Sequence, residues 1–177
     1  YVYNDTIIKV SFISAMNIGD TNTLKVYYHG APQGDHSNWG GWHSQNGYYY
    51  NLGVGFAANP HTCGRAWFPC FDNFVEKTSY DFHITTVSPL RPYCNGIRQS
   101  ETVINGDTIL THWEHTEPTP TYLASVAISN YTELNDTVAA MNGVLPIQLM
   151  AKPQDSLKMY NSFVNLKPTL HGLEAAF

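Results

Sequence analysis

Eight histidines are the first candidates for chemistry in this sequence, because a neutral imidazole is a common metal ligand. His112 and His115 flank Glu114 in a stretch that alternates like a β-strand. Residues three positions apart on a strand project to opposite faces of the sheet. These two imidazoles are therefore not expected to share a metal ion.

Three further histidines recur at intervals of seven residues in a glycine-rich stretch, namely His29, His36 and His43. A zinc site needs ligands held at fixed distances and angles, and a glycine-rich loop offers no such scaffold. The sequence also contains no His-Glu dipeptide, and so no His-Glu-x-x-His zinc helix. We predict that the chain contains no catalytic residue, no cofactor-binding residue and no metal ligand.

The three cysteines, Cys63, Cys70 and Cys94, show no Cys-x-x-Cys spacing, so neither a zinc ribbon nor a thioredoxin-type site is indicated. A disulfide between Cys63 and Cys70 is one interpretation, and buried free thiols are the other. Cys70 follows a proline within an aromatic run, without the spacing of a nucleophile elbow. A cysteine nucleophile is not predicted.

The most distinctive stretch, residues 64–73, reads Gly-Arg-Ala-Trp-Phe-Pro-Cys-Phe-Asp-Asn. Its aromatic residues, Trp67 and Phe68 among them, make it too apolar for a solvent-exposed loop. Pro69 is incompatible with a helix interior. We expect an extended entry, a turn at Pro69 and a buried anchor on either side.

Arg65 and Asp72 lie near the two ends of this stretch, where a guanidinium and a carboxylate could pair and close the turn. We interpret the pair as structural rather than catalytic. If it is buried, loss of one partner would cost roughly 3–5 kcal/mol of stability.

The composition describes an ordinary globular chain of one domain, or one domain plus a fragment, with 177 residues of which 43% are hydrophobic. The net charge of −5 and the lack of a basic run argue against nucleic-acid binding. No apolar run approaches the length needed to cross a bilayer, so no transmembrane segment is expected. A composition rich in Asn, Thr and Tyr and poor in Lys favours an exported or periplasmic, extracytoplasmic protein.

Most of the chain alternates apolar and polar residues with the period of a β-strand. The expected strands are residues 6–12, 24–28, 80–85, 97–104, 108–115, 122–128, 137–140 and 144–151. The first two should pair as a hairpin, and residues 29–47 should form a loop. Asn105-Gly106 predicts a tight hairpin turn, and Pro118 and Pro120 are expected to break the strand before them.

The pattern changes to a helical period near Gln154, where Asp155-Ser156 is a good N-cap pair. A proline at position 168 is expected to break or kink this helix. We therefore predict an all-β, multi-sheet, β-sandwich-like domain over residues 1–153. Residues 154–177 would form a C-terminal helical segment that begins another domain.

The central motif, Arg65-x-Trp67-Phe68-Pro69-Cys70-x-Asp72, resembles the aminopeptidase N family of gluzincin zinc peptidases. Glu-Pro-Thr-Pro-Thr-Tyr-Leu-Ala at residues 117–124 is similar to a Thr-x-Pro-Met-x-x-Tyr-Leu pattern of that family. Residues 171–177 resemble the first helical stretch of its catalytic domain. The resemblance spans roughly residues 24–177.

The resemblance implies a non-catalytic N-terminal β domain that scaffolds a catalytic domain and lines the peptide-substrate cleft. Zinc is then expected in that catalytic domain, which is missing here, and the partners are the catalytic domain and a peptide. In the family a Gln or Glu shortly before the central Arg binds the substrate amino group. The matching residues 55–62 contain neither, so Asn59 and His61 become the candidates for the cleft.

Two other interpretations remain. The first is a stand-alone carbohydrate- or protein-binding β module with Trp39, Trp42 and the three tyrosines at positions 48–50 as its platform. The second is a degenerate family member that kept the scaffold and lost activity. In every case this segment alone is expected to be inactive.

Overall fold

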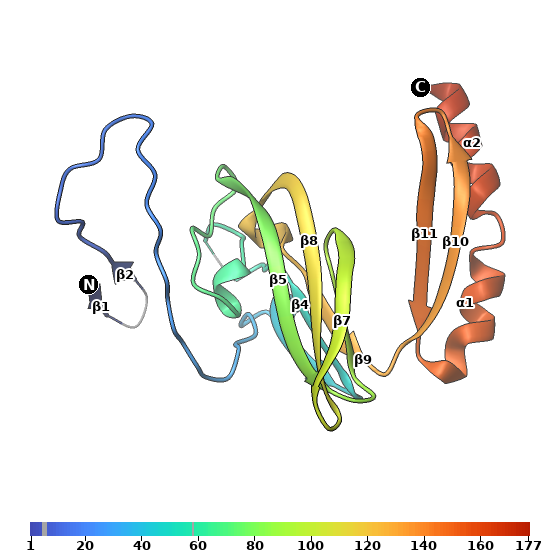
Figure 1. Cartoon of the computed structure of the whole chain (residues 1–177), viewed down its shortest axis with the longest axis horizontal. Helices are drawn as coiled ribbons and strands as arrows, with labels where there is room; N and C mark the ends of the chain where they lie inside the picture. The colour runs from blue at the N-terminus through green and yellow to red at the C-terminus, as the bar shows by residue number, and fades with distance from the viewer. Residues whose placement is uncertain (5–6, 58) are drawn as a thin grey trace. The chain divides into compact units, whose positions relative to one another are not determined.

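The computed structural model describes residues 1–4, 7–57 and 59–177 (Figure 1). The chain forms two compact units, Tyr1–Gly30 and Ala31–Phe177. No described helix is both long and apolar enough to cross a membrane. The motif and the candidate cleft residues all belong to the second unit.

The first unit contains one short antiparallel pair, β1 (Val2–Tyr3) with β2 (Ile8–Lys9). The strand expected over residues 6–12 is thus shortened, and Thr6 lies outside the described residues. Residues 24–28 are irregular, so the strand and hairpin expected there are wrong. Leu24 is 57% exposed in this unit. An alternating pattern stabilises a strand only when its apolar face is covered.

The second unit contains two larger antiparallel sheets. The four-stranded sheet has the order β3 (Gly41–Gln45), β4 (Tyr48–Leu52), β9 (Val126–Ser129), β6 (Arg91–Cys94). The three-stranded sheet has the order β5 (Lys77–Val87), β8 (Thr108–Pro120), β7 (Ile97–Asn105). Short 3-10 turns occur at η1 (Gly64–Ala66), η2 (Thr121–Leu123) and η3 (Pro153–Asp155).

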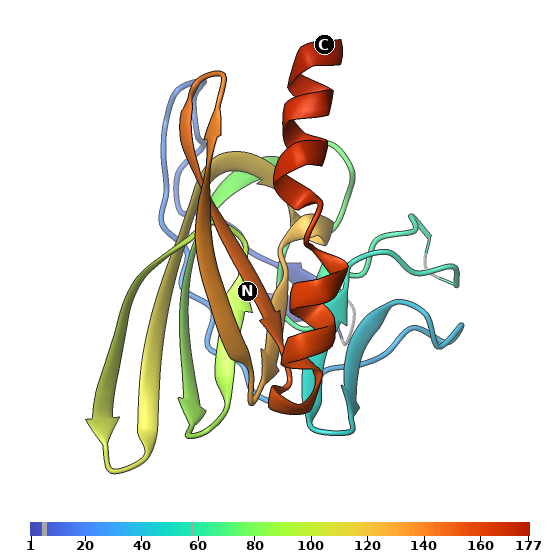
Figure 2. The ribbon, with the colours of Figure 1, turned by 90° about the vertical axis from the view of Figure 1, so that its right-hand side faces the viewer.

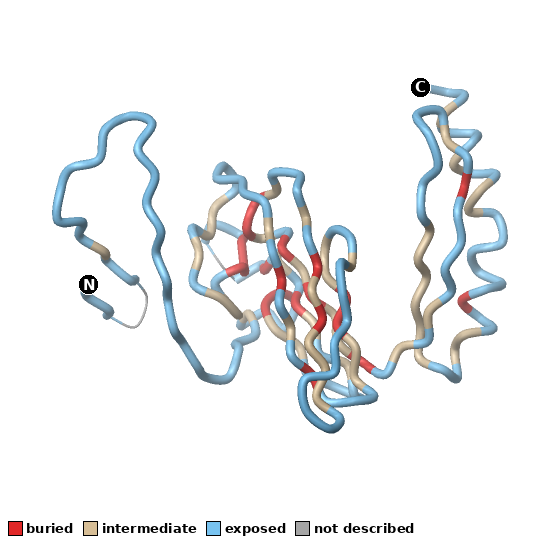
Figure 3. Tube along the Cα trace, viewed as in Figure 1, coloured by how far each residue is buried: buried red, intermediate tan, exposed pale blue. Residues whose placement is uncertain are grey.

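The core lies where these two sheets meet, as the buried positions in Figure 3 indicate. Phe82 of β5 and Trp113 of β8 pack with Tyr93 of β6, and each is less than a tenth exposed. The Trp113 indole N–H donates to the carbonyl of Pro92 at 3.2 Å, which joins the two sheets by a polar contact. The predicted multi-sheet, sandwich-like β domain is confirmed.

The hairpin predicted at Asn105-Gly106 is present: Asn105 pairs with Thr108, and Gly106 has a φ of 54°. The break expected at Pro118 and Pro120 is wrong, because β8 runs through both. Pairing of β7 with β8 begins at Glu114, so beyond that residue one edge of β8 has no partner strand. Proline is tolerated on such an edge because no ladder hydrogen bond needs its missing N–H.

The loop expected over residues 29–47 also needs correction, because residues 41–45 form β3. Gly41 carries a φ of 84°, and the Trp42 amide donates to the Gln33 carbonyl at 2.9 Å. Glycine therefore starts this strand rather than extending the loop, because it takes the positive φ at the bend.

The C-terminal part consists of the hairpin β10 (Thr132–Ala140) and β11 (Gly143–Ala151), then α1 (Ser156–Ser162) and α2 (Leu166–Ala176). Figures 1 and 2 show α1 and α2 alongside this hairpin, with α1 against β11 and α2 against β10. The helical segment is thus confirmed. The domain boundary expected between residues 153 and 154 stays a prediction.

The sequence predicted a helix break at Pro168, but the break falls at residues 163–165. Pro168 is the third residue of α2. The first turn of a helix has amides without an intrahelical acceptor, so a proline there removes no hydrogen bond.

Candidate functional site

The loop that carries the two cleft candidates is closed at its base by backbone contacts. The amide of Cys63 donates to the carbonyl of Gly53 at 2.7 Å, and Val54 bridges to Thr62. A Cβ built on Gly53 would lie 1.4 Å from the carbonyl oxygen of Tyr122. Only glycine allows this close approach, which fixes the loop base against η2.

The same loop is joined to the central motif through Thr62, which is fully buried. Its hydroxyl donates to the backbone carbonyl of Asp72 at 3.0 Å. The Thr121 hydroxyl donates to the carbonyl of Phe71 at 2.8 Å, so the motif is also held to η2. A buried hydroxyl that keeps a hydrogen bond avoids the cost of an unsatisfied buried polar group.

The carboxylate of Asp72 organises the motif. It is 4% exposed and accepts hydrogen bonds from the amides of Gly64 at 3.1 Å and Arg65 at 3.3 Å. Its third contact is the expected ion pair with the Arg65 guanidinium, at 3.0 Å, although that side chain is 45% exposed. The carboxylate therefore replaces water for two amides that would otherwise be unpaired.

The aromatic part of the motif packs inward, as expected. Trp67 stacks on Phe82 of the core with ring centroids 6.5 Å apart and contacts Phe68 at 4.6 Å. Pro69 itself is exposed and follows Phe68 at the turn. The motif thus anchors the loop of residues 53–62 to the sandwich core.

Asn59 and His61 are both exposed on this loop. The Nδ1 atom of His61 lies 3.2 Å from the carbonyl oxygen of Gly55, which orients the ring across the loop. The two candidates therefore lie on a loop whose base is fixed by hydrogen bonds. Their contact with a substrate stays a prediction.

All three cysteines are free thiols, so the second of the two cysteine interpretations applies. Burial, with the nearby Asp72, raises the pKa of Cys70 to about 11. Burial raises the pKa of Cys94 to about 12, and burial together with Asp35 raises that of Cys63. Thiols with raised pKa values stay protonated at neutral pH and are poor nucleophiles.

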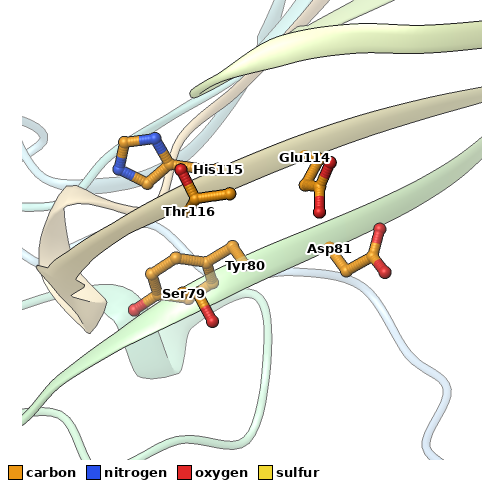
Figure 4. Close-up of a pocket in the computed structure, with 6 residues that line it drawn as sticks. All are labelled: Ser79, Tyr80, Asp81, Glu114, His115 and Thr116. Carbon is orange, nitrogen blue, oxygen red and sulfur yellow. The ribbon is translucent and has the colours of Figure 1, made fainter.

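Open cavities on the described surface include two near the motif and the sheet. One, of about 310 Å³, is next to the motif and is lined by Phe68, Cys70 and Tyr80 among others. The other, of about 390 Å³, lies over β5 and β8 (Figure 4). Neither is lined by Asn59 or His61.

Figure 4 shows Asp81 of β5 and Glu114 of β8 next to each other across the two strands, in agreement with their register. His115 points away from them and lies 2.8 Å from the Thr119 hydroxyl. Both carboxylates are exposed. This arrangement can attract a cation, but it contains no oriented nucleophile or buried acid.

Asp81 also belongs to a second group, with His83 and His112. Each of these three residues brings one ligand atom to within 4.8 Å of the others. Sequence reasoning missed this group because it compared histidines along one strand. His83 and His112 meet only through the register of β5 with β8. The one available signal was the alternation that places Asp81 and His83 on the same face.

The aromatic residues considered as a binding platform do not form one surface. Trp42 packs on Trp67 with centroids 6.4 Å apart, and Trp39 contacts Phe56 at 5.8 Å. Tyr50 stacks on His43 at 5.0 Å, while Tyr48 contacts Tyr131 at 5.9 Å. Four of the five rings thus contact four different neighbours, while Tyr49 is exposed, and the carbohydrate-platform interpretation gains no support.

Comparison with known proteins agrees with the family resemblance of the central motif. A family model described as the peptidase M1 N-terminal domain matches residues 4–123 of the 177. No curated protein matches the chain.

Two solved structures illustrate the likeness of fold. An M1 zinc metallopeptidase of Deinococcus radiodurans bound to a Tyr-Ser-Ala substrate is 17% identical, with a TM-score of 0.59 over 70% of this chain and 28% of its own. Aminopeptidase A of Legionella pneumophila in complex with aspartic acid is 18% identical, with a TM-score of 0.58 over 71% of this chain and 14% of its own. The chain therefore spans under a third of either protein.

Proposed function

Because the chain belongs to the peptidase M1 N-terminal domain family, we propose that it is the non-catalytic β domain of a zinc peptidase similar to aminopeptidase N. Its role would be to support the catalytic domain and to line one side of the peptide cleft. The observation that carries this proposal is the family match over residues 4–123, which includes the whole central motif.

The zinc of such an enzyme would be held by the catalytic domain. One solved structure of similar fold is a two-domain M1 zinc metallopeptidase, and this chain covers 27% of its length. The present sequence has no His-Glu-x-x-His motif, so its own residues do not match that zinc site. The chain's contribution to the reaction would be to position the peptide, not to activate water.

The loop of residues 53–62 is the part we propose to face the peptide. The hydrogen bonds at the base of this loop, made by Thr62 and Cys63, would fix its position relative to the sandwich. They would thereby restrict where Asn59 and His61 can lie. A preorganised loop lowers the entropy lost when a ligand binds. An Asn amide oxygen or an imidazole nitrogen can accept a hydrogen bond from the peptide's amino group, in place of the family's Gln or Glu.

The helical segment supplies a surface for the catalytic domain. Large apolar side chains are exposed along it, including Leu157 at 70%, Val164 at 66% and Leu173 at 52%. Exposed apolar surface of this kind marks an interaction site. We propose that it packs against the catalytic domain, and that the whole protein is exported.

We expect the chain of residues 1–177 alone to hydrolyse no aminoacyl-arylamide substrate, because no described cluster combines a nucleophile with a general base. The polypeptide extended by its catalytic domain should hydrolyse such substrates and lose this activity with a zinc chelator. Both proteins would be assayed at equal molar concentration. Hydrolysis by the 1–177 chain alone, or none by the extended protein, would contradict the proposal. The latter result would instead favour a degenerate homologue.

A further inference from the structure

A second site lies on the outer face of the three-stranded sheet. His83 of β5 and His112 of β8 stand directly opposite each other in the register. Their imidazole rings stack with centroids 4.2 Å apart and an angle of 12° between planes. Asp81 precedes His83 by two residues and therefore projects from the same face. We propose that Asp81, His83 and His112 together bind one divalent transition-metal ion, of which Zn²⁺ is the one to test.

The distances fit a single ion. The Oδ1 atom of Asp81 lies 3.5 Å from Nε2 of His83 and also contacts Nε2 of His112. All three ligand atoms lie within 4.8 Å of one another. Zinc binds imidazole nitrogen at about 2.0–2.1 Å and carboxylate oxygen at about 2.0–2.2 Å, so two ligands of one ion lie roughly 3–4 Å apart. Small side-chain rotations suffice to reach that geometry.

The chemistry of the donors selects the class of metal. Two imidazoles and one carboxylate suit Zn²⁺, Ni²⁺ or Cu²⁺, whereas Ca²⁺ and Mg²⁺ prefer oxygen ligands alone. The two imidazoles are stacked, and both turn Nε2 toward the same carboxylate oxygen of Asp81. A cation placed between them can accept a lone pair from each nitrogen, and its charge is balanced by the carboxylate.

The scaffold also favours binding. The three ligands come from adjacent residues of one antiparallel pair, so the sheet ladder fixes their spacing without ordering a loop. Glu114, directly opposite Asp81, projects from the same face and adds negative charge beside the site. Three protein ligands leave a position open for water or for a group from another molecule.

The ligands are accessible, since the side chains of Asp81, His83 and His112 are 63%, 55% and 27% exposed. The site is therefore an exchangeable surface site. It is separate from the zinc proposed for the catalytic domain, and it departs from the prediction that this chain has no metal ligand.

The test is a titration of the purified, metal-free 1–177 chain with Zn²⁺. Binding is measured by calorimetry and by the shift of the midpoint of thermal unfolding. We expect one saturable equivalent and a raised midpoint. His83→Asn and His112→Asn should each weaken binding by at least about tenfold, because loss of an outer-shell partner alone costs about 10–100-fold. His36→Asn, which changes an exposed histidine elsewhere in the same unit, should bind as the parent does.

The unfolding midpoints of the metal-free variants serve as the structural control. They should stay close to that of the parent, because His83 and His112 lie on the outer face of the sheet and not in the core. Absence of a saturable equivalent would overturn the inference. Equal affinity in the two ligand variants and the parent would also overturn it. Binding that appears only together with dimer formation would refute a site made of one chain's three ligands.

Discussion

Replacing Asp72 by alanine is expected to destabilise the second unit by about 2–6 kcal/mol, because a backbone amide that loses its acceptor costs about 1–3 kcal/mol and this carboxylate serves two of them. The carboxylate is 4% exposed and accepts from the amides of Gly64 and Arg65 as well as from the Arg65 guanidinium. The variant leaves all three donors without this partner, and two of them are backbone amides, which cannot reorient as a side chain can. Urea unfolding followed by tryptophan fluorescence measures the change.

Arg65→Ala is the matched control, and it should cost only about 1 kcal/mol. The Arg65 side chain is 45% exposed, and its removal leaves Asp72 with both amide donors. Partly exposed ion pairs contribute little after solvent screening. Equal losses of stability in the two variants would show that the ion pair, and not the carboxylate's bonds to the backbone, holds the motif.

Acid is expected to loosen the junction between the β10–β11 hairpin and the sandwich. Glu133 of β10 accepts from the two terminal guanidinium nitrogens of Arg98, at 2.5 and 3.1 Å, and from the Tyr93 hydroxyl at 2.5 Å. Burial raises the pKa of Glu133, but the hydrogen bonds from Arg98, Tyr93 and Asn135 outweigh it and lower the pKa from 4.5 to about 2.

The lowered pKa fixes the direction of the effect. Between pH 4.5 and about 2 the unfolded chain binds a proton at Glu133 that the folded chain does not. The stabilisation is therefore complete above about pH 4.5 and is lost as the pH falls toward 2. At about 1.4 kcal/mol per pKa unit, the loss is of the order of 3 kcal/mol.

Glu133→Gln isolates this contribution. The free energy of unfolding of the parent minus that of the variant should be large and constant from pH 7 to 5, and should shrink toward pH 2. Glu117→Gln, at an exposed position of β8, is the control and should give a small difference at every pH. A parent-to-Glu133→Gln difference that does not change with pH would contradict the account.

Local patterns predicted much of this fold, because a strand or hairpin turn depends on neighbouring residues. The alternation around Phe82 and the turn at Asn105-Gly106 each predicted their element correctly. The errors arose where contacts with residues distant in the sequence determine the local structure. Pro118 and Pro120 remain in β8 because β7 does not extend along them, and residues 24–28 lack a covered face in their unit.

The same distinction between local and distant contacts applies to the candidate site. The Arg65–Asp72 pair was predicted because its partners flank one turn, whereas the role of the Asp72 carboxylate toward two amides depends on a backbone path that residue types do not encode. The His83–His112 contact and the Arg98–Glu133 junction join residues 29 and 35 positions apart. Such contacts follow from strand register and sheet packing, which periodicity alone does not determine.

Photolabelling tests the central claim most directly. The protein extended by its catalytic domain would be irradiated with a dipeptide that carries a photoreactive group at its amino-terminal residue, and the labelled residues would be mapped by mass spectrometry. We predict labelling within residues 55–62, at or next to Asn59 and His61, that excess unlabelled dipeptide abolishes. Competable labelling that is confined to sequence outside residues 31–177 would show that this domain does not line the peptide cleft.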